Sequence, residues 1–316
     1  MGTRSSKDNK FKTFSLRVLE AMNARKVRLL RWVVQIFSFV LLNGGLIGLG
    51  WTQLPLPIEQ PTAAPFTTVV SAFEAIQAFF SMGQFPFLVF GVSLLIGGIF
   101  GRMLCGWVCP FGFFQDLLRL VPVKKWKISK PLNKGLRDIR AVIFWAAIII
   151  AGFLGYRELV GESLQGNFSF FDSQPWTPLN PVATLFVMFF YMIFNGRYPG
   201  AESFVIGDWT FMFYFRIVLL LAVIVVSIFV PRFYCRYVCP TGYAMGFTAK
   251  YSLIGISRNP ARCTRCGACE DMCEKTAMQV PILDYSYERV RDENCTNCGN
   301  CLDACPHGAI HFKFKG

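Results

Sequence analysis

Four long stretches of apolar residues constrain the fold of this 316-residue chain more than any other feature of its sequence. A helix needs about 20 such residues to cross roughly 30 Å of membrane hydrocarbon. The stretches are Leu29–Trp51, Phe85–Leu104, Ile139–Tyr156 and Phe211–Val230, and none carries a charge near its middle. With 53% hydrophobic and 16% charged residues and a mean hydropathy of +0.42, the composition excludes a disordered chain and argues against a purely soluble enzyme. The sequence therefore predicts four membrane-spanning helices.

The distribution of lysine and arginine predicts the orientation of these spans. Residues 1–31, 102–140 and 231–316 hold 29 of the 32 Lys and Arg residues, and four spans place these segments on one side of the membrane. Positive charge accumulates on the cytoplasmic side. We therefore expect a multi-pass protein of the bacterial inner membrane, with both termini and the central loop in the cytoplasm and residues 52–84 and 157–210 facing outward. The net charge of +13 is then a topology signal, and no nucleic-acid partner is expected.

Two other apolar segments are not counted as spans. Pro181–Phe194 has only 14 residues, a length typical of re-entrant, interfacial or bundle-packed segments. A fifth span there would also place the last basic segment outside, against the charge rule. Pro65–Gly83 is expected to form an interfacial helix on the outer face.

Two cysteine runs near the C-terminus have the spacing of bacterial ferredoxins that hold two [4Fe–4S] clusters. Each run has three cysteines at three-residue intervals and a fourth that, in such proteins, binds the other cluster. We therefore expect one cluster on Cys263, Cys266, Cys269 and Cys305, and a second on Cys295, Cys298, Cys301 and Cys273. Structural zinc uses two separated cysteine pairs and cytoplasmic disulfides are rare, so both alternatives fit less well. Amides of Gly267 and Gly299, with nearby Arg262 and Arg265, are expected to raise the cluster potentials.

The predicted fold is therefore an all-α membrane bundle of four transmembrane helices with a C-terminal α+β two-cluster ferredoxin-like domain. Residues 1–28 form a basic cytoplasmic arm, residues 29–257 the membrane domain, and residues 258–316 the ferredoxin-like domain.

The other four cysteines form an internal repeat whose two copies are 130 residues apart. In each copy an Arg is followed by Cys-x3-Cys-Pro and then by Gly; the copies run from Arg102 to Gly112 and from Arg232 to Gly242. Residues four apart share a helix face, so each copy presents two thiols together. One interpretation is an additional redox or metal site on Cys105, Cys109, Cys235 and Cys239. The alternative is that these are packing cysteines, because cysteine is among the most commonly buried residues.

Charged residues near the outer face are candidates for handling protons or substrate. Carboxylates in the segments expected to face outward are Glu74, Glu158, Glu162, Asp172 and Asp208, and solvated loop positions explain each of them equally well. Arg216 lies within the fourth span but close to its outer end, so snorkelling to the interface is the preferred interpretation. No catalytic residue is assigned.

These motifs resemble those of the NapH/MauN group of ferredoxin-type membrane proteins, whose membrane core is shared with NosR-like regulators. The resemblance rests on the two Cys-x3-Cys-Pro elements, on Asn180-Pro181-Val182 before the fourth span, and on the two ferredoxin runs, and it extends from about Leu29 to Phe312. It implies a four-span protein with cytoplasmic clusters. A NosR-like covalent flavin domain is not expected.

The resemblance also implies a function. It indicates a membrane-bound electron-transfer subunit of a quinol dehydrogenase module, with quinone or quinol as substrate. Electrons would pass between the quinone pool and a partner iron–sulfur protein and c-type cytochrome, or a periplasmic reductase. The alternative is a membrane ferredoxin that acts in the maturation or regulation of another metalloenzyme. A transporter with a redox sensor is a weaker hypothesis, because no charge lies mid-span.

Overall fold

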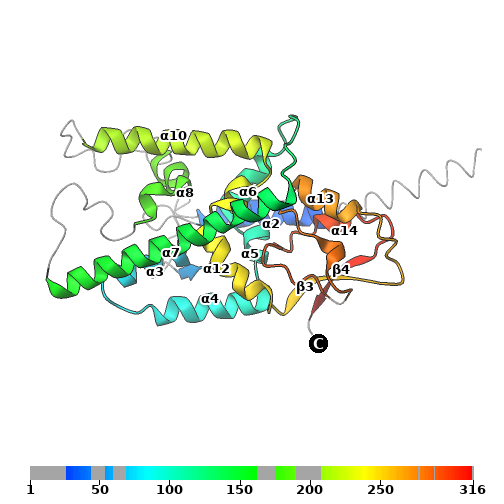
Figure 1. The fold of residues 1–316 in the computed structure, drawn as a ribbon, viewed down its shortest axis with the longest axis horizontal. Coiled ribbons are helices and arrows are strands. Elements are labelled where there is room, and N and C mark those ends of the chain that lie inside the picture. The colour runs from blue at the N-terminus through cyan, green and yellow to red at the C-terminus, as the bar shows by residue number, and fades with distance from the viewer. Residues whose placement is uncertain are drawn as a thin grey trace, which may run out of the picture.

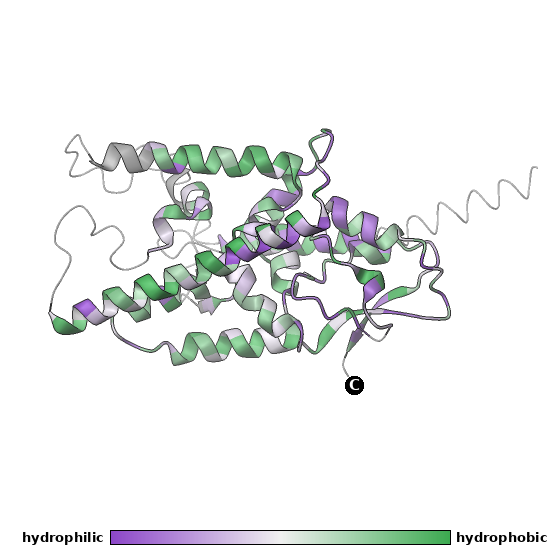
Figure 2. Ribbon diagram, viewed as in Figure 1, coloured by the Kyte–Doolittle hydropathy of each residue, from purple (hydrophilic) through white to green (hydrophobic). Residues whose placement is uncertain are grey.

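The chain divides into a helical part and a small ferredoxin part at one end. The computed structural model describes residues 26–43, 54–59, 69–161, 175–189, 208–276, 278–287 and 289–314. In Figure 1 the ferredoxin elements gather beside the C-terminus, and long helices extend away from them. Figure 2 shows that these long helices are mainly hydrophobic, whereas the ferredoxin end carries more hydrophilic segments.

Three of the predicted spans correspond to long apolar helices with altered bounds. These helices are α4 (Phe87–Phe100), α7 (Lys130–Val160) and α10 (Asp208–Phe229). Within the described residues, one segment, Lys130–Arg157 of α7, is long and apolar enough to cross a membrane. The apolar helix Phe87–Phe100 is shorter, as is Tyr214–Phe229, the part of α10 whose side chains are described. Four transmembrane helices are therefore not confirmed, although α7 supports membrane association.

The end of α4 explains why the second predicted span is shorter, and α2 differs from the first predicted span in where it begins. Helix α4 ends at Gly101, whose φ of 58° lies in the left-handed region that breaks a helix. Helix α2 (Lys26–Leu42) begins before the predicted start of the first span, and residues 44–51 of that span lie outside the described residues. The first turns of α2 carry Arg31, which is fully buried. This end of α2 packs against the ferredoxin part, where Arg28 N donates to Asp303.

The helical part has two halves, and each half contains one copy of the cysteine repeat. In each half the chain folds back after a long helix. Helix α4 is followed by α5 (Met103–Trp107) and α6 (Pro110–Leu118), and α10 is followed by α11 (Phe233–Tyr237) and α12 (Pro240–Ala249). Proline occupies the first turn of both α6 and α12, where its missing N–H breaks no helical hydrogen bond. Helix α12 packs on α4, and α6 packs on α10. Each half therefore supplies the short helix that covers the long helix of the other half.

The segments between the halves are packed inside the bundle. Strands β1 (Leu54–Leu56) and β2 (Val69–Ser71) pair in parallel and lead into α3 (Ala72–Ser81). Most of α3 is buried, and it packs along α7. The helix expected within 65–83 therefore exists, but its predicted interfacial position is wrong; residues 65–68 lie outside the described residues.

The segment after residue 175 contains only short helical turns. They are η3 (Thr177–Leu179), α8 (Pro181–Ala183) and the π-helical η4 (Thr184–Phe189). The Asn180 side chain begins this helical run by accepting a hydrogen bond from Val182 N at 3.0 Å. The predicted short apolar segment is thus helical as far as residue 189, and its last five residues lie outside the described part.

The ferredoxin part is a two-stranded antiparallel sheet with short helices. Strand β3 (Ile254–Arg258) pairs with β4 (Ile310–Phe314), so that Ile254 lies opposite Phe314. Between them lie α13 (Ala268–Thr276), η6 (Ile282–Asp284) and α14 (Asn300–Ala304). Leu253 N, directly before β3, donates to Gly98 O of α4, which joins the sheet to the helical part.

Candidate functional site

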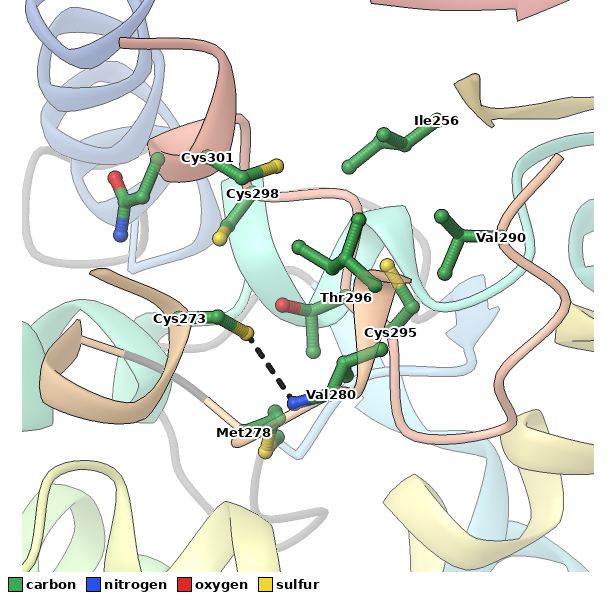
Figure 3. A pocket seen from close by; sticks show the side chains of 11 residues that line it. Ile256, Cys273, Met278, Val280, Val290, Cys295, Thr296, Cys298 and Cys301 are labelled. Carbon is green, nitrogen blue, oxygen red and sulfur yellow. Dashed lines mark hydrogen bonds between the residues drawn. The ribbon is translucent and has the colours of Figure 1, made fainter. Parts of the chain in front are cut away.

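The cysteines predicted for the second cluster surround one cavity. Cys273 from α13, Cys295 and Cys298 from the preceding loop, and Cys301 from α14 line a cavity of about 20 Å³ (Figure 3). The rest of its lining is mainly apolar and includes Ile256 and Val290. Val280 N donates to Cys273 Sγ at 3.4 Å, the contact drawn as a dashed line. Four converging sulfur atoms and an amide donor fit an iron–sulfur cluster.

The cysteines predicted for the first cluster surround a second cavity. It also measures about 20 Å³, and its lining includes Cys263, Cys266, Cys269 and Cys305. Cys266 is exposed, whereas Cys269 is buried. Arg258 donates from Nη1 to Cys263 Sγ at 3.7 Å, and Ala309 N donates to Cys305 Sγ at 3.3 Å. The fourth cysteine of each run thus lies with the other run, as the ferredoxin spacing predicts.

The residues expected to tune the cluster potentials lie beside the cavities. Arg262, Arg265 and Gly267 line the first cavity. Gly267 and Gly299 each have a φ of 79°, a backbone conformation that favours glycine. The observed amide donors to sulfur include those of Val280 and Ala309.

The four cysteines of the internal repeat are buried where the two folded-back halves meet. Cys105 lies in α5 and Cys235 in α11, while Cys109 and Cys239 precede α6 and α12. Cys235 and Cys239 both interact electrostatically with Cys105 of the other half. Gln115 Nε2 of α6 donates to Cys235 Sγ at 3.0 Å, which also crosses between the halves. The fold therefore gathers thiols that are 130 residues apart in the sequence.

The arginine that begins each repeat reaches into the opposite half. Arg232 donates from Nε and Nη2 to the Asp116 carboxylate of α6, at 3.0 and 2.5 Å. Arg102 donates to Glu293 O at 3.0 Å, and its Nη2 atom approaches Gly242 of α12 so closely that an added Cβ would lie 2.8 Å away. Arg102 Nη2 and Nε are buried without a hydrogen-bond partner among the described residues. Arg102 and Arg232 both interact electrostatically with Cys235.

Asp116 joins three parts of the chain through a fully buried carboxylate. Besides Arg232, it accepts hydrogen bonds from Arg31 and Gln35 of α2, each at 3.2 Å. Arg31 also donates a hydrogen bond from Nη1 to Asn300 Oδ1 in the ferredoxin part. Burial raises the pKa of Asp116, but the charges of Arg232 and Arg31 outweigh burial and hold that pKa below its usual value.

A second buried carboxylate, Glu59, lies beside the repeat cysteines. Tyr234 OH and Asn180 Nδ2 donate to its Oε1 at 3.2 and 2.9 Å, and Thr241 Oγ1 donates to its Oε2 at 2.5 Å. Cys239 Sγ is 3.6 Å from the same Oε2. Burial raises the pKa of Glu59 to about 7.

Two of the charged candidates from the sequence have different surroundings from those expected. Glu74 is fully buried and accepts a hydrogen bond from Asn180 at 3.1 Å, so a solvated loop position is wrong for this residue. Arg216 is buried and donates to the carbonyls of Pro178 and Thr177, at 3.0 and 3.1 Å, so the snorkelling interpretation is also wrong. Glu162 and Asp172, and the side chains of Glu158 and Asp208, lie outside the described residues.

The repeat cysteines and the second cluster cavity are joined by direct packing. Gly106, next to Cys105, lies against the cavity loop, where an added Cβ would be 2.7 Å from Thr296 O and 3.6 Å from Cys298 Cα. Trp107 Nε1 donates to Asn297 O at 2.9 Å. Arg232 interacts electrostatically with both Cys235 and Cys298. In the described part of the chain, no three His, Cys, Asp or Glu side chains have the geometry of a site for a single metal ion.

The cysteine sites define a class, and comparisons with known proteins agree with it. Residues 82–129 and 212–258, which contain the two repeats, each match the family described as a 4Fe-4S binding domain. Residues 262–309 match the 4Fe-4S dicluster domain. The chain therefore carries domains of the 4Fe-4S iron–sulfur type.

Individual relatives of the chain show which iron–sulfur proteins it is similar to. Over 62% of this chain it is 28% identical to the methylamine utilization ferredoxin-type protein MauN of Paracoccus denitrificans. It is 28% identical to the regulatory protein NosR of Pseudomonas aeruginosa over 59% of the chain, and 24% identical to the putative electron transport protein YccM of Escherichia coli over 75%. With its 4Fe-4S domains, the chain is consistent with the MauN/NapH/NosR-like ferredoxin-type proteins.

The similarity covers only part of each relative's length. The matches cover 56% of MauN, 22% of NosR and 56% of YccM, so the chain spans less than two thirds of each relative. No solved structure matches.

Proposed function

We propose that this protein is a membrane-bound electron carrier that connects the quinone pool to a partner iron–sulfur protein and c-type cytochrome, or to a periplasmic reductase. The observation that carries the proposal is the convergence of the eight ferredoxin cysteines on two separate cavities, one of which packs against the repeat cysteines among the apolar helices. The second ferredoxin cavity and the repeat cysteines thereby lie side by side within one chain. The name of the E. coli relative, a putative electron transport protein, supports the same direction.

The chemistry of a quinol matches several one-electron centres. Oxidation of a quinol to a quinone releases two electrons and two protons, whereas an iron–sulfur cluster takes up one electron at a time. The protein would contribute binding, orientation and the surroundings that set the potentials. Cys266 is exposed, so the first cavity is the one that a partner protein reaches most directly.

We also propose that the four repeat cysteines hold a third iron–sulfur centre. Both repeats match a 4Fe-4S binding domain, and their buried thiols influence one another electrostatically across the contact between the halves. The buried Arg102 Nη2 atom has no hydrogen-bond partner in the described part of the chain, and a buried cation without an anion is unfavourable. An anionic cluster on Cys105, Cys109, Cys235 and Cys239 would supply that anion and add a one-electron site beside the helices.

Iron analysis tests the third centre. Purified protein should hold more than about eight iron atoms, the number that two [4Fe–4S] clusters require. Cys105→Ala and Cys239→Ala should lower the count while the ferredoxin signals remain in electron paramagnetic resonance. A count of eight that neither substitution changes would show that these cysteines only pack.

Reduction by quinol tests the electron-transfer proposal. Reconstituted protein in lipid, together with its natural partners, should show bleaching of the cluster absorbance when a quinol is added. The expected controls are protein without iron and the corresponding quinone, neither of which bleaches. If dithionite reduces the clusters but quinol never does, a quinol-linked role is excluded.

A second candidate function is maturation or regulation of another metalloenzyme. One relative bears the name regulatory protein, and a membrane ferredoxin with the same clusters could serve such a role. A deletion strain separates the two functions. Loss of an electron carrier leaves a fully metallated partner enzyme without electrons, whereas loss of a maturation factor leaves that enzyme without its metal centre.

A further inference from the structure

A large cavity lies among the helices and shares no lining residue with either ferredoxin cavity. Its volume is about 400 Å³, and its lining residues come mainly from α3, α4, α7 and α12. The walls are apolar and rich in aromatic rings, including Phe73, Phe90, Phe144 and Trp145. Such a volume is within the range of pockets that bind small organic ligands.

One side of the cavity opens to the apolar surface of the helices. Two of its lining residues, Leu94 of α4 and Phe247 of α12, are 60% and 52% exposed. In a membrane these side chains would face lipid, so an apolar ligand could enter sideways from the bilayer.

Two hydroxyl groups give the cavity a polar side. Ser93 of α4 lines it, and its Oγ atom is buried with no hydrogen-bond partner among the residues that the structure describes. Thr241 of α12 also lines it; this hydroxyl donates its proton to Glu59 Oε2, which leaves its oxygen able to accept. Thr241 lies two residues after Cys239, so this polar side is next to the repeat cysteines.

We propose that this cavity binds the ring of a quinone or quinol, an assignment that rests on the proposed function. A flat apolar ring fits between aromatic walls. Its oxygen atoms can accept a hydrogen bond from Ser93 or, in the quinol, donate one to Thr241. A lipid acyl chain has no polar group to satisfy Ser93, which favours the ring over a lipid tail. Bound in this way, the ring lies at the wall formed by α12, the helix that begins at the repeat cysteines.

Binding of 2-methyl-1,4-naphthoquinone to the cluster-loaded protein tests the site. Quenching of tryptophan fluorescence should be saturable, because Trp145 forms part of the wall. Ala244→Phe fills the cavity and should weaken binding at least tenfold. Ala146→Phe introduces the same side chain at an exposed position of α7 outside the cavity and should leave binding unchanged. Binding that is not saturable, or equal affinity in both variants, would overturn the assignment.

Photolabelling of the unaltered protein provides a test that does not depend on a variant folding. An azido-naphthoquinone should label peptides that contain 144–148 or 241–248, and unlabelled quinone should compete. Labelling confined to other peptides would also overturn the site, and labelling that excess phospholipid but not quinone suppresses would identify a lipid instead.

Cluster reduction by quinol, measured on the same samples, separates this inference from the proposed function. Unchanged reduction in Ala244→Phe would reject the cavity while the electron-transfer role stands. Saturable binding without any cluster reduction in the unaltered protein would reject that role while the binding site stands.

Discussion

Asp116 is the residue whose loss we expect to destabilise the helical part most. Its carboxylate is buried between Arg31 and Arg232, and removing one partner of a buried ion pair leaves uncompensated charge. Asp116→Asn should therefore lower the free energy of unfolding by about 3–5 kcal/mol, measured by denaturant titration in detergent. Asp271→Asn breaks the exposed ion pair with Lys275 and should change the free energy of unfolding by less than about 1 kcal/mol. Equal effects of the two substitutions would show that the buried pair is not important for stability.

The same residue predicts a dependence on pH. Because the pKa of Asp116 is lower in the folded protein than in the unfolded chain, its contribution is fully present above the unfolded pKa of about 4. It is lost as the pH falls through the folded value. The difference in stability between the unaltered protein and Asp116→Asn should therefore shrink below about pH 4. A difference that grows on acidification would contradict this assignment.

At the scale of residues, spacing predicted the cysteines well and the buried carboxylates poorly. The ferredoxin runs carry their geometry in the sequence, and the two predicted sets of four cysteines do line two separate cavities. Glu59 stands in a loop with no motif around it, and only the fold brings Thr241 and Asn180 to it. Asp116 did have a signal, because a lone acid in the apolar run of α6 needs a buried partner.

At the scale of elements, the contact between α3 and α7 depends on one glycine. A Cβ at Gly155 would lie 1.9 Å from Phe80 O, whereas a Cβ at Gly152 would meet nothing within 4 Å. Gly155→Ala should force the two helices apart and lower stability by at least about 1–3 kcal/mol. Gly152→Ala, on the same helix, should leave stability unchanged or raise it, because alanine favours helix more than glycine does. Thermal unfolding in detergent measures both, and a harmless Gly155→Ala would contradict this packing.

The exchange of the fourth cysteine between the two ferredoxin runs gives another test at this scale. Cys273 belongs to the first run in sequence but lines the cavity of the second. Cys273→Ala should therefore remove the same paramagnetic signal, and about four iron atoms, as Cys301→Ala does. Cys269→Ala should remove the other signal. A Cys273→Ala spectrum that matches Cys269→Ala would mean that each run holds its own cluster.

The sequence predicts a helix well where one apolar run forms that helix, as in α7. It predicts the helices poorly where the chain folds back on itself, as at α6 and α12. The core of α7 agrees with the predicted third span because nothing interrupts its apolar half. The folded-back helices α6 and α12 were not predicted, since each is covered by the other half of the molecule. Their burial is a tertiary effect that a local pattern does not contain.

At the scale of the whole molecule, the sites form a series from the apolar helices to the surface. Thr241 lines the large cavity and donates a hydrogen bond to Glu59, and Glu59 in turn contacts Cys239. Gly106, next to the repeat residue Cys105, packs against the backbone of Cys298, which lines the second cavity. In the first cavity, Cys266 is exposed at the surface. Such an order suits transfer of electrons along one chain.

The arrangement of charge gives a prediction about the membrane. Because basic residues gather in segments 1–31, 102–140 and 231–316, a green fluorescent protein fused to the C-terminus should fluoresce inside the cell. Alkaline phosphatase fused after Gly161 should be active, because that position follows α7 toward the expected outer side. The reverse pattern would overturn the proposed orientation.

The unequal burial of the two cysteine quartets sets the order in which air should damage the protein. Cys266 is exposed, whereas Cys298 and Cys301 are buried. Dioxygen attacks accessible sulfur first, so aerobic handling should pass through a half-loaded form that has lost only its outermost cluster. Under the proposed function, that form would still accept an electron from the bilayer side but would no longer deliver it to another protein.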